Sequence, residues 1–510
     1  MRQAYKVRCN KIAYIWYGAF FFNLILALVI VFFQRRDPKT VWAWLLVLYF
    51  LPLVGFVLYL FFGRNFYCER KFKNKVIEDM RVVEAGKQDE KIILNDFTVS
   101  DKVNEDYVNL VRLNLRTGSC FYTENNAVNI FTDGNSKFDA LIEAIEKAEK
   151  FVLLQYYIIR EDIVFERICR CLKKKAAMGV KVYVLADGVG SRKIPGRYWR
   201  ELEAVGVQVN LFFPAVAKKI DLRVNYRNHR KIVVIDGVVG FMGGFNIGKE
   251  YLGIDKKYGY WRDTHLKIEG DAVMELMLKF VQDWNYAAET EKESLDYKNF
   301  DILTKNYRTE NIRQDMRQEN EKMNVPERSV GLQIISSGPD IKNEQIRDNF
   351  LYMIYHARKN IYIQSPYFIP DEAVFCALKM AAQRDVEVKI MIPCKPDHPF
   401  VYWATLSFVG DLLRCGARCY VYQNGFLHAK AVLVDGIVSS VGTANMDVRS
   451  FKLNFEVNAM IYDRGVTGEL EQIFLKDIGK SRELTLYDYR QRGFGVRVKE
   501  QVSRLLSPLL

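Results

Sequence analysis

The first sixty-odd residues contain two long runs without a charged side chain. These runs cover residues 12–33 and 41–63, and the segment QRRDPKT at 34–40 separates them. Each run is as long as the roughly 20 residues that a helix needs to span a bilayer. A signal peptide is excluded, because the first run is too long for its apolar region and a second run follows at once. The pattern predicts a two-helix transmembrane hairpin within residues 1–66.

Cations flank both runs and indicate the orientation of this hairpin. Lys and Arg residues precede the first run, and a denser group follows the second run up to residue 75, with fewer in the connector. The more cationic flanks of a membrane segment stay in the cytoplasm. We therefore expect both ends of the hairpin, and the long remainder of the chain, to face the cytoplasm.

Beyond residue 120 a pattern of helical stretches and short apolar runs occurs twice. Residues 141–159 (LIEAIEKAEK, then FVLLQYYII) correspond to 349–369, and 175–187 correspond to 380–393. Apolar strands that alternate with helices predict α/β layers around a largely parallel sheet. The expected divisions are a membrane-to-catalytic region at 67–120, a first α/β domain at 121–290, a charged linker at 291–328 and a second α/β domain at 329–510.

Each domain contains the same polar pattern at one end of an apolar strand. The first copy has His229, Lys231, Asp236, Gly243, Gly244 and Asn246; the second has His428, Lys430, Asp435, Gly442, Thr443 and Asn445, at identical spacing. On a strand, residues i and i+2 share a face, so each His lies beside its Lys. A single such His is most simply a hydrogen-bonded core or surface residue. Its recurrence with the whole pattern, in a chain with five His, indicates a site.

These residue types suit the transfer of a phosphoryl group. One His can attack phosphorus, and the other can protonate the leaving alkoxide. Lys and Asn side chains can stabilise the phosphate oxygens, so this chemistry needs no metal or other cofactor. Glycines would let the backbone approach the phosphate. We also expect Asp263 to orient His229 and Glu456 to orient His428; ordinary salt bridges are the alternative for these two acids.

The doubled His-x-Lys-x4-Asp-x6-Gly-(Gly/Ser/Thr)-x-Asn pattern resembles the phospholipase D superfamily. The resemblance implies two similar α/β units that form one pseudo-twofold active site. It implies His229 as the nucleophile and His428 as the general acid and then base. Phosphate would be held by Lys231, Lys430, Asn246 and Asn445. The motif residues Asp236 and Asp435 count with the catalytic set, although in this superfamily they shape the site rather than touch phosphorus.

Other segments are similar to bacterial cardiolipin synthases within that superfamily. They are residues 35–63, 155–162, 364–372, 425–430 and 504–510. This likeness implies a multi-pass protein of the bacterial plasma membrane with cytoplasmic catalytic domains. The implied reaction joins two phosphatidylglycerol molecules into cardiolipin and glycerol through a phosphatidyl-histidine intermediate. Phosphatidylethanolamine remains open as the second lipid, and so does the oligomeric state.

Charge and cysteine content add less. The net charge of +13 suits an anionic partner, and the membrane runs favour anionic phospholipid over nucleic acid. The nine Cys have no metal-binding spacing and are interpreted as reduced structural thiols. Residues 487–510 mix cations with apolar residues, as in an amphipathic helix that lies at a membrane or docks on the domain. The rival functions are a membrane-tethered hydrolase or nuclease of the same superfamily, and a non-catalytic lipid-binding protein.

Overall fold

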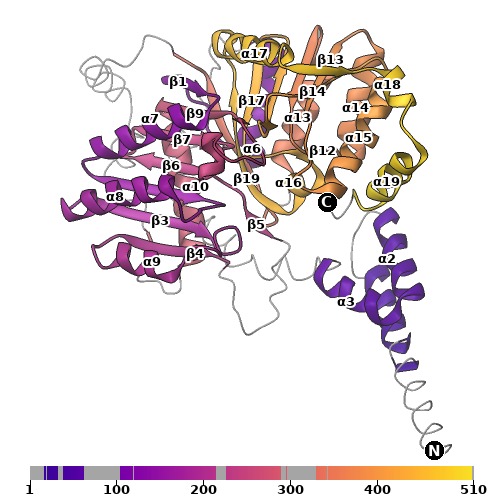
Figure 1. Cartoon of the computed structure of the whole chain (residues 1–510), viewed down its shortest axis with the longest axis horizontal. Helices are drawn as coiled ribbons and strands as arrows, with labels where there is room; N and C mark the ends of the chain where they lie inside the picture. Colours follow the sequence, from indigo (N-terminus) through magenta and orange to yellow (C-terminus); the bar gives the residue numbers. More distant parts are fainter. Residues whose placement is uncertain are drawn as a thin grey trace, which may run out of the picture. The chain divides into compact units, whose positions relative to one another are not determined.

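The computed structural model describes residues 17–18, 20–32, 38–62, 104–118, 120–213, 226–288, 294–295, 329–341 and 343–507. The chain forms two compact units, one of residues 1–74 with 216–226 and one of residues 75–215 with 227–510 (Figure 1). All but two residues of the expected linker at 291–328 lie outside the described residues.

In the N-terminal unit the expected second span is not one helix. Residues 20–32 are helical, and the chain then forms α2 (Pro38–Phe50) and α3 (Pro52–Phe62). Within the described ranges, no helix combines the length and the apolar character needed to cross a membrane. The start of the first expected span, residues 12–16, lies outside the described residues.

The break between α2 and α3 has a local cause. Pro52 has no backbone N–H and cannot donate to the carbonyl of Leu48, four residues earlier. The side-chain amide of Asn23 donates to that carbonyl at 3.2 Å and to the carbonyl of Pro52 at 2.8 Å. A polar residue in the first uncharged run thus satisfies the backbone groups at the break in the second.

The large unit contains two similar halves, which Figure 1 colours purple to pink and orange to yellow. The first half has a seven-stranded sheet of order β1-β9-β7-β6-β2-β3-β4. Its strands are β1 (Asn126–Phe131), β2 (Phe151–Tyr156), β3 (Lys181–Asp187), β4 (Gln208–Phe212), β6 (Ile232–Ile235), β7 (Val239–Gly243) and β9 (His265–Gly270). Its helices are α7 (Gly134–Lys147), α8 (Ile163–Ala177), α9 (Gly196–Glu203) and α10 (Ala272–Ala287), with the 3-10 turn η2 (Lys249–Leu252).

The second half repeats this plan around the order β10-β19-β17-β16-β11-β13-β14-β20. Its strands are β10 (Leu332–Ser337), β11 (Asn360–Gln364), β13 (Glu387–Pro393), β14 (Arg418–Tyr422), β16 (Ala431–Val434), β17 (Val438–Gly442), β19 (Asn454–Ile461) and β20 (Ser481–Leu484), with the short pair β12 (Phe368–Ile369) and β18 (Met446–Asp447). Its helices are α13 (Gln345–His356), α14 (Glu372–Gln383), α15 (Pro399–Leu413), α16 (Val448–Lys452), α17 (Arg464–Ile478), α18 (Leu486–Arg490) and α19 (Phe494–Leu505).

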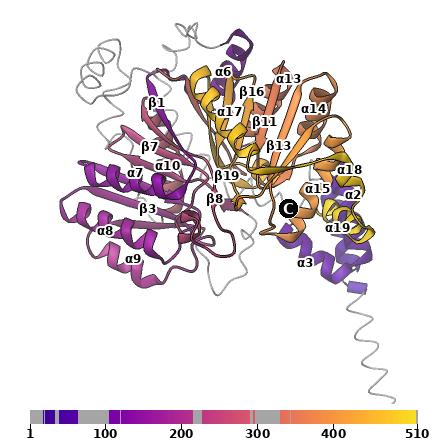
Figure 2. The same cartoon turned by 45° about the horizontal axis from the view of Figure 1, so that its top comes forward.

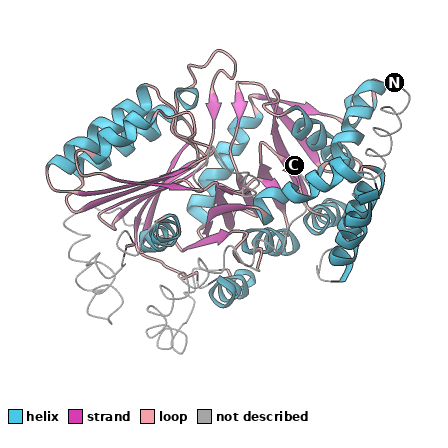
Figure 3. Cartoon of the chain, turned by 90° about the horizontal axis from the view of Figure 1, so that it is seen from below, coloured by secondary structure: helices cyan, strands magenta, loops and turns pink. Residues whose placement is uncertain are grey.

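The sheets are mixed, which corrects the expectation of largely parallel sheets. Strands β2, β3 and β4 are parallel, whereas β6, β7, β9 and β1 pair antiparallel. The cause is a tight turn after each motif strand, where Asp236 and Asp435 have φ of +52° and +57° and a glycine with positive φ follows each. These turns send the chain straight back beside β6 and β16. Helices and loops cover the sheets, as Figure 3 shows from below.

The residues before the first domain also contradict an expected boundary. Helix α6 (Glu105–Gly118) was expected to belong to a connecting region, but Tyr107, Leu110 and Val111 lie in the core of the second half. Asn114 is buried there and donates to Gln333 and Asn349 at 3.0 and 2.9 Å. The chain therefore contributes a helix to the second half before it builds the first.

Two short parallel strand pairs join the halves. Strand β5 (Arg227–Asn228) pairs with β19, and β15 (Phe426–Leu427) pairs with β8 (Trp261–Arg262). Strand β5 ends directly before His229, and β15 ends directly before His428. Each motif His therefore follows a strand that pairs with a strand of the opposite half. Figure 2 shows β8 and β19 at the junction of the halves.

Candidate active site

The backbone N–H of each motif His donates a hydrogen bond to a carbonyl of the other half. The N–H of His229 donates to the carbonyl of Phe455 at 2.9 Å, and that of His428 donates to the carbonyl of Arg262 at 2.7 Å. The two imidazoles are nearly enclosed, with side-chain exposures of 12% and 10%. The predicted pseudo-twofold arrangement of the two motifs is thus present in the backbone.

The carboxylate partners are crossed, and the expected assignment of Asp263 and Glu456 is wrong. Nδ1 of His229 lies 2.9 Å from Oε2 of Glu456, and Nδ1 of His428 lies 2.6 Å from Oδ2 of Asp263. The cause is the strand pairing: β5 leads to His229 beside β19, which carries Glu456, and β15 leads to His428 beside β8, which Asp263 follows. Each half supplies the acid for the other half's imidazole.

These hydrogen bonds define what each imidazole can do. A carboxylate on Nδ1 favours the tautomer with the proton on that nitrogen, which leaves the Nε2 lone pair for phosphorus. Burial lowers the pKa of His229 to about 4, although Glu456 opposes that shift. Burial and Lys430 lower the pKa of His428 as well. Both imidazoles are therefore neutral near pH 7 before substrate binds, which is the state a nucleophile needs.

The two acids remain ionised. Burial acts to raise the pKa of Asp263, but Lys430 and His428 hold it below its ordinary value. Burial also acts to raise the pKa of Glu456, but His229 and Lys231 hold it below its ordinary value. Both carboxylates are fully buried. Each can thus stabilise positive charge as it develops on its imidazole.

The two motif lysines join the half-sites into one centre. Lys231 Nζ donates to the carbonyl of His229 at 2.7 Å, and Lys430 Nζ donates to that of His428 and lies 2.8 Å from its Nδ1. Burial lowers the pKa of Lys231 to about 7 and that of Lys430 to about 8. Asp263 and Glu456 both act to raise the pKa of each lysine, so the two ammonium groups lie near the same two carboxylates. An anionic phosphate would restore their protonated state.

The motif asparagines are buried, and the glycines have a different role from the one expected. Asn246 donates to the Tyr251 hydroxyl at 3.0 Å, whereas Oδ1 of Asn445 is buried without a partner among the residues described. A Cβ on Gly244 would lie 1.9 Å from Oδ1 of Asp263, and one on Gly442 would lie 2.3 Å from Oδ1 of Asn458. The glycines thus leave space for the segments that carry the carboxylates. We had expected them to let the backbone approach the phosphate.

Asp236 and Asp435 lie outside the reacting centre. The carboxylate of Asp236 accepts hydrogen bonds from the N–H groups of residues 149, 150 and 151, at 2.7 to 2.8 Å. Asp435 does the same for residues 358, 359 and 360. Five residues of extended chain, roughly 16 Å, separate Asp236 from Lys231. These two acids were expected in the catalytic set, and the structure corrects this. Each one binds the end of its motif strand to the start of the neighbouring strand, which is the shaping role that the resemblance implies.

Two buried arginines support the His strands, and the sequence reasoning missed them. Arg230 binds Asp283 of α10 through two hydrogen bonds of 2.7 and 2.8 Å, and its Nε donates to the carbonyl of Glu456. In the second half Asp477 of α17 accepts from Arg262, a residue of the first half, at 2.7 Å. Arg230 occupies the central position of its His-x-Lys motif, where the second copy has Ala429. A sequence signal for them is the Gln that recurs at equivalent repeat positions, Gln155 and Gln364. In the structure each of these Gln residues donates to one of the two acids.

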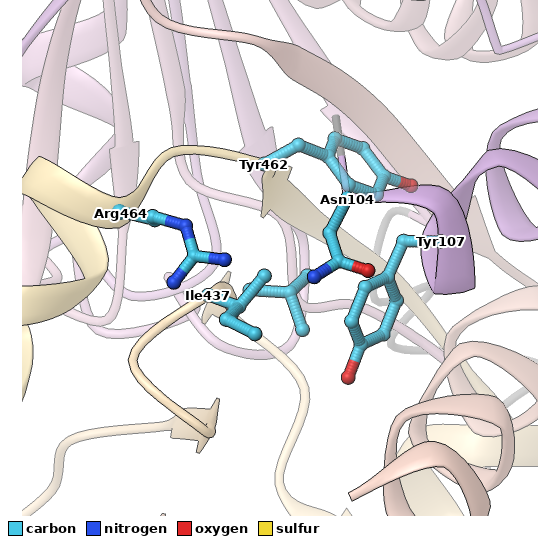
Figure 4. Close-up of a pocket in the computed structure, with 6 residues that line it drawn as sticks. Asn104, Tyr107, Ile437, Tyr462 and Arg464 are labelled. Carbon is cyan, nitrogen blue, oxygen red and sulfur yellow. The ribbon is translucent and has the colours of Figure 1, made fainter. Parts of the chain in front are cut away.

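One pocket contains none of the His, Lys, Asp or Asn residues of the two motifs. It is lined by Asn104, Tyr107, Ile437, Val438, Tyr462 and Arg464 (Figure 4). Among the described residues, no group of three or more His, Cys, Asp or Glu is placed to hold a metal ion. At the crossed His pair the described residues place two lysines, Lys231 and Lys430.

The crossed His–carboxylate pairs and their two lysines lie where the two similar α/β halves join. The model of the family described as cardiolipin synthase, PLD-like domain, matches residues 141–284 and 350–478. A second model, described as phospholipase D-nuclease N-terminal, matches residues 21–64. The chain belongs to the cardiolipin synthase family and is a phosphatidyltransferase.

Relatives agree over nearly the full length. The chain is 46% identical over 502 residues to a cardiolipin synthase of Oceanobacillus iheyensis, covering 96% of this chain and 98% of that one. It is 44% identical over 494 residues to the major cardiolipin synthase of Bacillus subtilis, with the same coverage. The solved phosphatidylserine synthase of Haemophilus influenzae has the same fold, with a TM-score of 0.57 at 15% identity, covering 80% of this chain and 100% of that one.

Proposed function

We propose that this chain transfers a phosphatidyl group from one phosphatidylglycerol to another, forming cardiolipin and releasing glycerol. The observation that carries the proposal is the crossed pair of His–carboxylate hydrogen bonds, which encloses two lysines. Two equivalent imidazoles suit a reaction whose two steps are the same displacement in opposite senses. The net charge of +13 favours an anionic lipid such as phosphatidylglycerol over a zwitterionic one.

In the first step Nε2 of His229 attacks phosphorus and forms a P–N bond as the P–O bond to the glycerol headgroup breaks. Binding of the anionic phosphodiester raises the pKa of His428, so that this imidazole holds a proton for the leaving alkoxide. Glu456 stabilises the positive charge that forms on His229, because its ionised carboxylate accepts a hydrogen bond from Nδ1–H. Glycerol leaves with the proton from His428.

In the second step a hydroxyl of the second lipid gives its proton to His428, now the base. The oxygen attacks phosphorus, the P–N bond breaks, and cardiolipin leaves while His229 returns to its neutral form. Lys231 and Lys430, with Asn246 and Asn445, stabilise the phosphorane oxygens in both steps. Water in place of the second lipid would give phosphatidic acid, so the outcome depends on which hydroxyl occupies the site.

The location follows from the substrate. We propose that the N-terminal unit is the membrane hairpin of a multi-pass plasma-membrane protein and that the catalytic unit faces the cytoplasm. The uncharged runs and the N-terminal family match at residues 21–64 support this placement. A bilayer anchor keeps the crossed site close to a two-tailed lipid that does not leave the membrane.

The test uses the full chain in vesicles of phosphatidylglycerol, with lipid products and free glycerol measured together. We expect cardiolipin and glycerol in equal amounts from the wild type and neither from His229→Ala. His356→Ala is the matched control, because His356 stacks on Tyr352 in α13, away from the motifs, with 3.9 Å between ring centroids. Phosphatidic acid as the main product would overturn the transferase in favour of a hydrolase.

A further inference from the structure

Helix α19 packs against the domain with a polar face. Its fully buried residues are Glu500 and Ser503. Glu500 accepts a hydrogen bond from Arg492 at 2.8 Å and one from the Tyr489 hydroxyl at 3.2 Å. An amphipathic helix that docks on a protein core buries its apolar residues. Helix α19 does the reverse.

The contact with α15 is polar as well. Arg504 donates to Asp411 at 2.6 Å and to Ser407 at 3.2 Å, and its guanidinium lies 4.5 Å from the ring centre of Phe408. Figures 1 and 2 show α19 alongside α15. These ionic contacts fix the rotation of α19 about its axis, and so they fix which residues point outward.

The outward face is an apolar stripe. Phe494 is 82% exposed, Val498 43%, Val502 47% and Leu505 81%. Their spacing of four, four and three residues places them on one side of the helix. Single exposed apolar residues are ordinary on a protein surface, but four on one helix face mark an interaction surface.

The charges around the stripe indicate its partner. Arg497 and Lys499 are exposed and flank the stripe, and the single acidic residue of α19 is the buried Glu500. A second copy of this helix would bring the same cations against each other, which opposes a symmetric contact. An anionic bilayer offers both an apolar interior for the stripe and phosphate groups for the cations.

The helix lies one layer from the active site. Helix α15 packs on β12, where the Thr405 hydroxyl accepts the N–H of Phe368 at 3.1 Å. Just before α15 begins, Asp397 accepts a hydrogen bond from the Tyr367 hydroxyl. Helix α15 therefore connects α19 to β12, which pairs with β18 directly after the motif residue Asn445.

We propose that the outer face of α19 is a membrane-docking surface that lies in the interface of an anionic bilayer and holds the catalytic unit against it. This second attachment is independent of the N-terminal unit, and it deepens the proposed function by fixing how the site meets its lipid. It commits to a lipid surface rather than to a protein partner.

The test places an environment-sensitive fluorescent amino acid at position 498 of the full chain reconstituted in phosphatidylglycerol vesicles. Position 163 in α8 is the matched control, because Ile163 is also apolar and 57% exposed. We expect a blue-shifted emission at 498, quenched by nitroxides on the lipid tails, and neither effect at 163. Because this readout needs no catalysis, it answers the question even if the transferase assignment fails.

Two results would overturn the proposal. The first is an emission at 498 that stays water-like and unquenched. The second is a blue shift that depends on protein concentration but not on lipid nitroxides, which would assign the stripe to a second copy. A kinetic test adds to this: the combined Phe494→Ser, Val498→Ser and Leu505→Ser variant should lose about tenfold in rate on bilayers. Its rate on a short-chain, monomeric phosphatidylglycerol should equal that of the wild type; a loss with both substrates would mean that the stripe supports the fold.

Discussion

His229 and Glu456 are 227 residues apart in the chain, yet Nδ1 of the one lies 2.9 Å from Oε2 of the other. The mirror contact between His428 and Asp263 completes the exchange. Neither half of the chain holds a complete His–carboxylate pair. The repeated domains therefore form one site whose two imidazoles both depend on the junction between the halves.

The crossed arrangement predicts which imidazole each acid controls. In Glu456→Gln the ring resonances of His229 should move while those of His428 stay, and Asp263→Asn should do the opposite. Each variant should also lose about 10²- to 10⁴-fold in kcat, because the correct tautomer and the charge on the imidazole lose support. Nitrogen-15 NMR of the five labelled His residues measures the shifts. If each substitution instead shifted the ring resonances of the His in the same half as the substituted acid, the crossed pairing would be wrong.

The pKa values of the site predict a bell-shaped profile of kcat/KM, which reports the free enzyme. As pH rises through about 4, His229 loses its proton and becomes nucleophilic, so the rate rises. As pH rises further, Lys231 loses its charge near 7 and Lys430 near 8, so the rate falls. Lys231→Arg should retain some activity and move the falling limb upward, because arginine stays charged. A profile that is flat across the pKa range of both lysines would contradict this account.

The Arg262–Asp477 pair should be important for stability, because it is buried and joins the halves. Arg262→Met leaves Asp477 buried without its cation, and we expect a loss of about 3–5 kcal/mol in the free energy of unfolding. Arg167→Met is the control: its pair with Asp139 is exposed at 41% and 64%, and its loss should cost about 0–1 kcal/mol. Denaturant unfolding of both variants gives the comparison. Equal losses would mean that the buried pair has no special role.

The motif aspartates should affect stability more than chemistry. Asp236→Asn keeps a side chain that tolerates positive φ but weakens the hydrogen bonds from three backbone N–H groups. We expect a loss of about 1–3 kcal/mol in unfolding free energy. The remaining folded enzyme should keep most of its kcat, whereas Lys231→Gln should lose about 10²- to 10³-fold without unfolding. If Asp236→Asn lost as much kcat as Lys231→Gln at equal stability, the shaping role would be wrong.

The repeat and the motif spacing were sufficient to predict two α/β halves, and they singled out the two His-x-Lys pairs that the structure brings to the junction of those halves. The spacing did not predict the carboxylate partners, because each copy contains one His and one acid, and only the pairing of β5 with β19 and β15 with β8 shows that they exchange. The sheets were expected to be largely parallel because the turn at each motif Asp was not recognised. Helix α6 was assigned to a connector, since no local pattern reveals that its apolar face packs on a domain that begins 200 residues later.

The covalent intermediate tests the account most directly. Phosphatidylglycerol labelled at phosphorus would be mixed with the full chain, quenched rapidly in alkali, and the labelled residue mapped. We predict an acid-labile label on His229 in the wild type and none in His229→Ala. Label on His428, or no protein-bound label while cardiolipin forms, would contradict the assignment of His229 as the nucleophile of the crossed site.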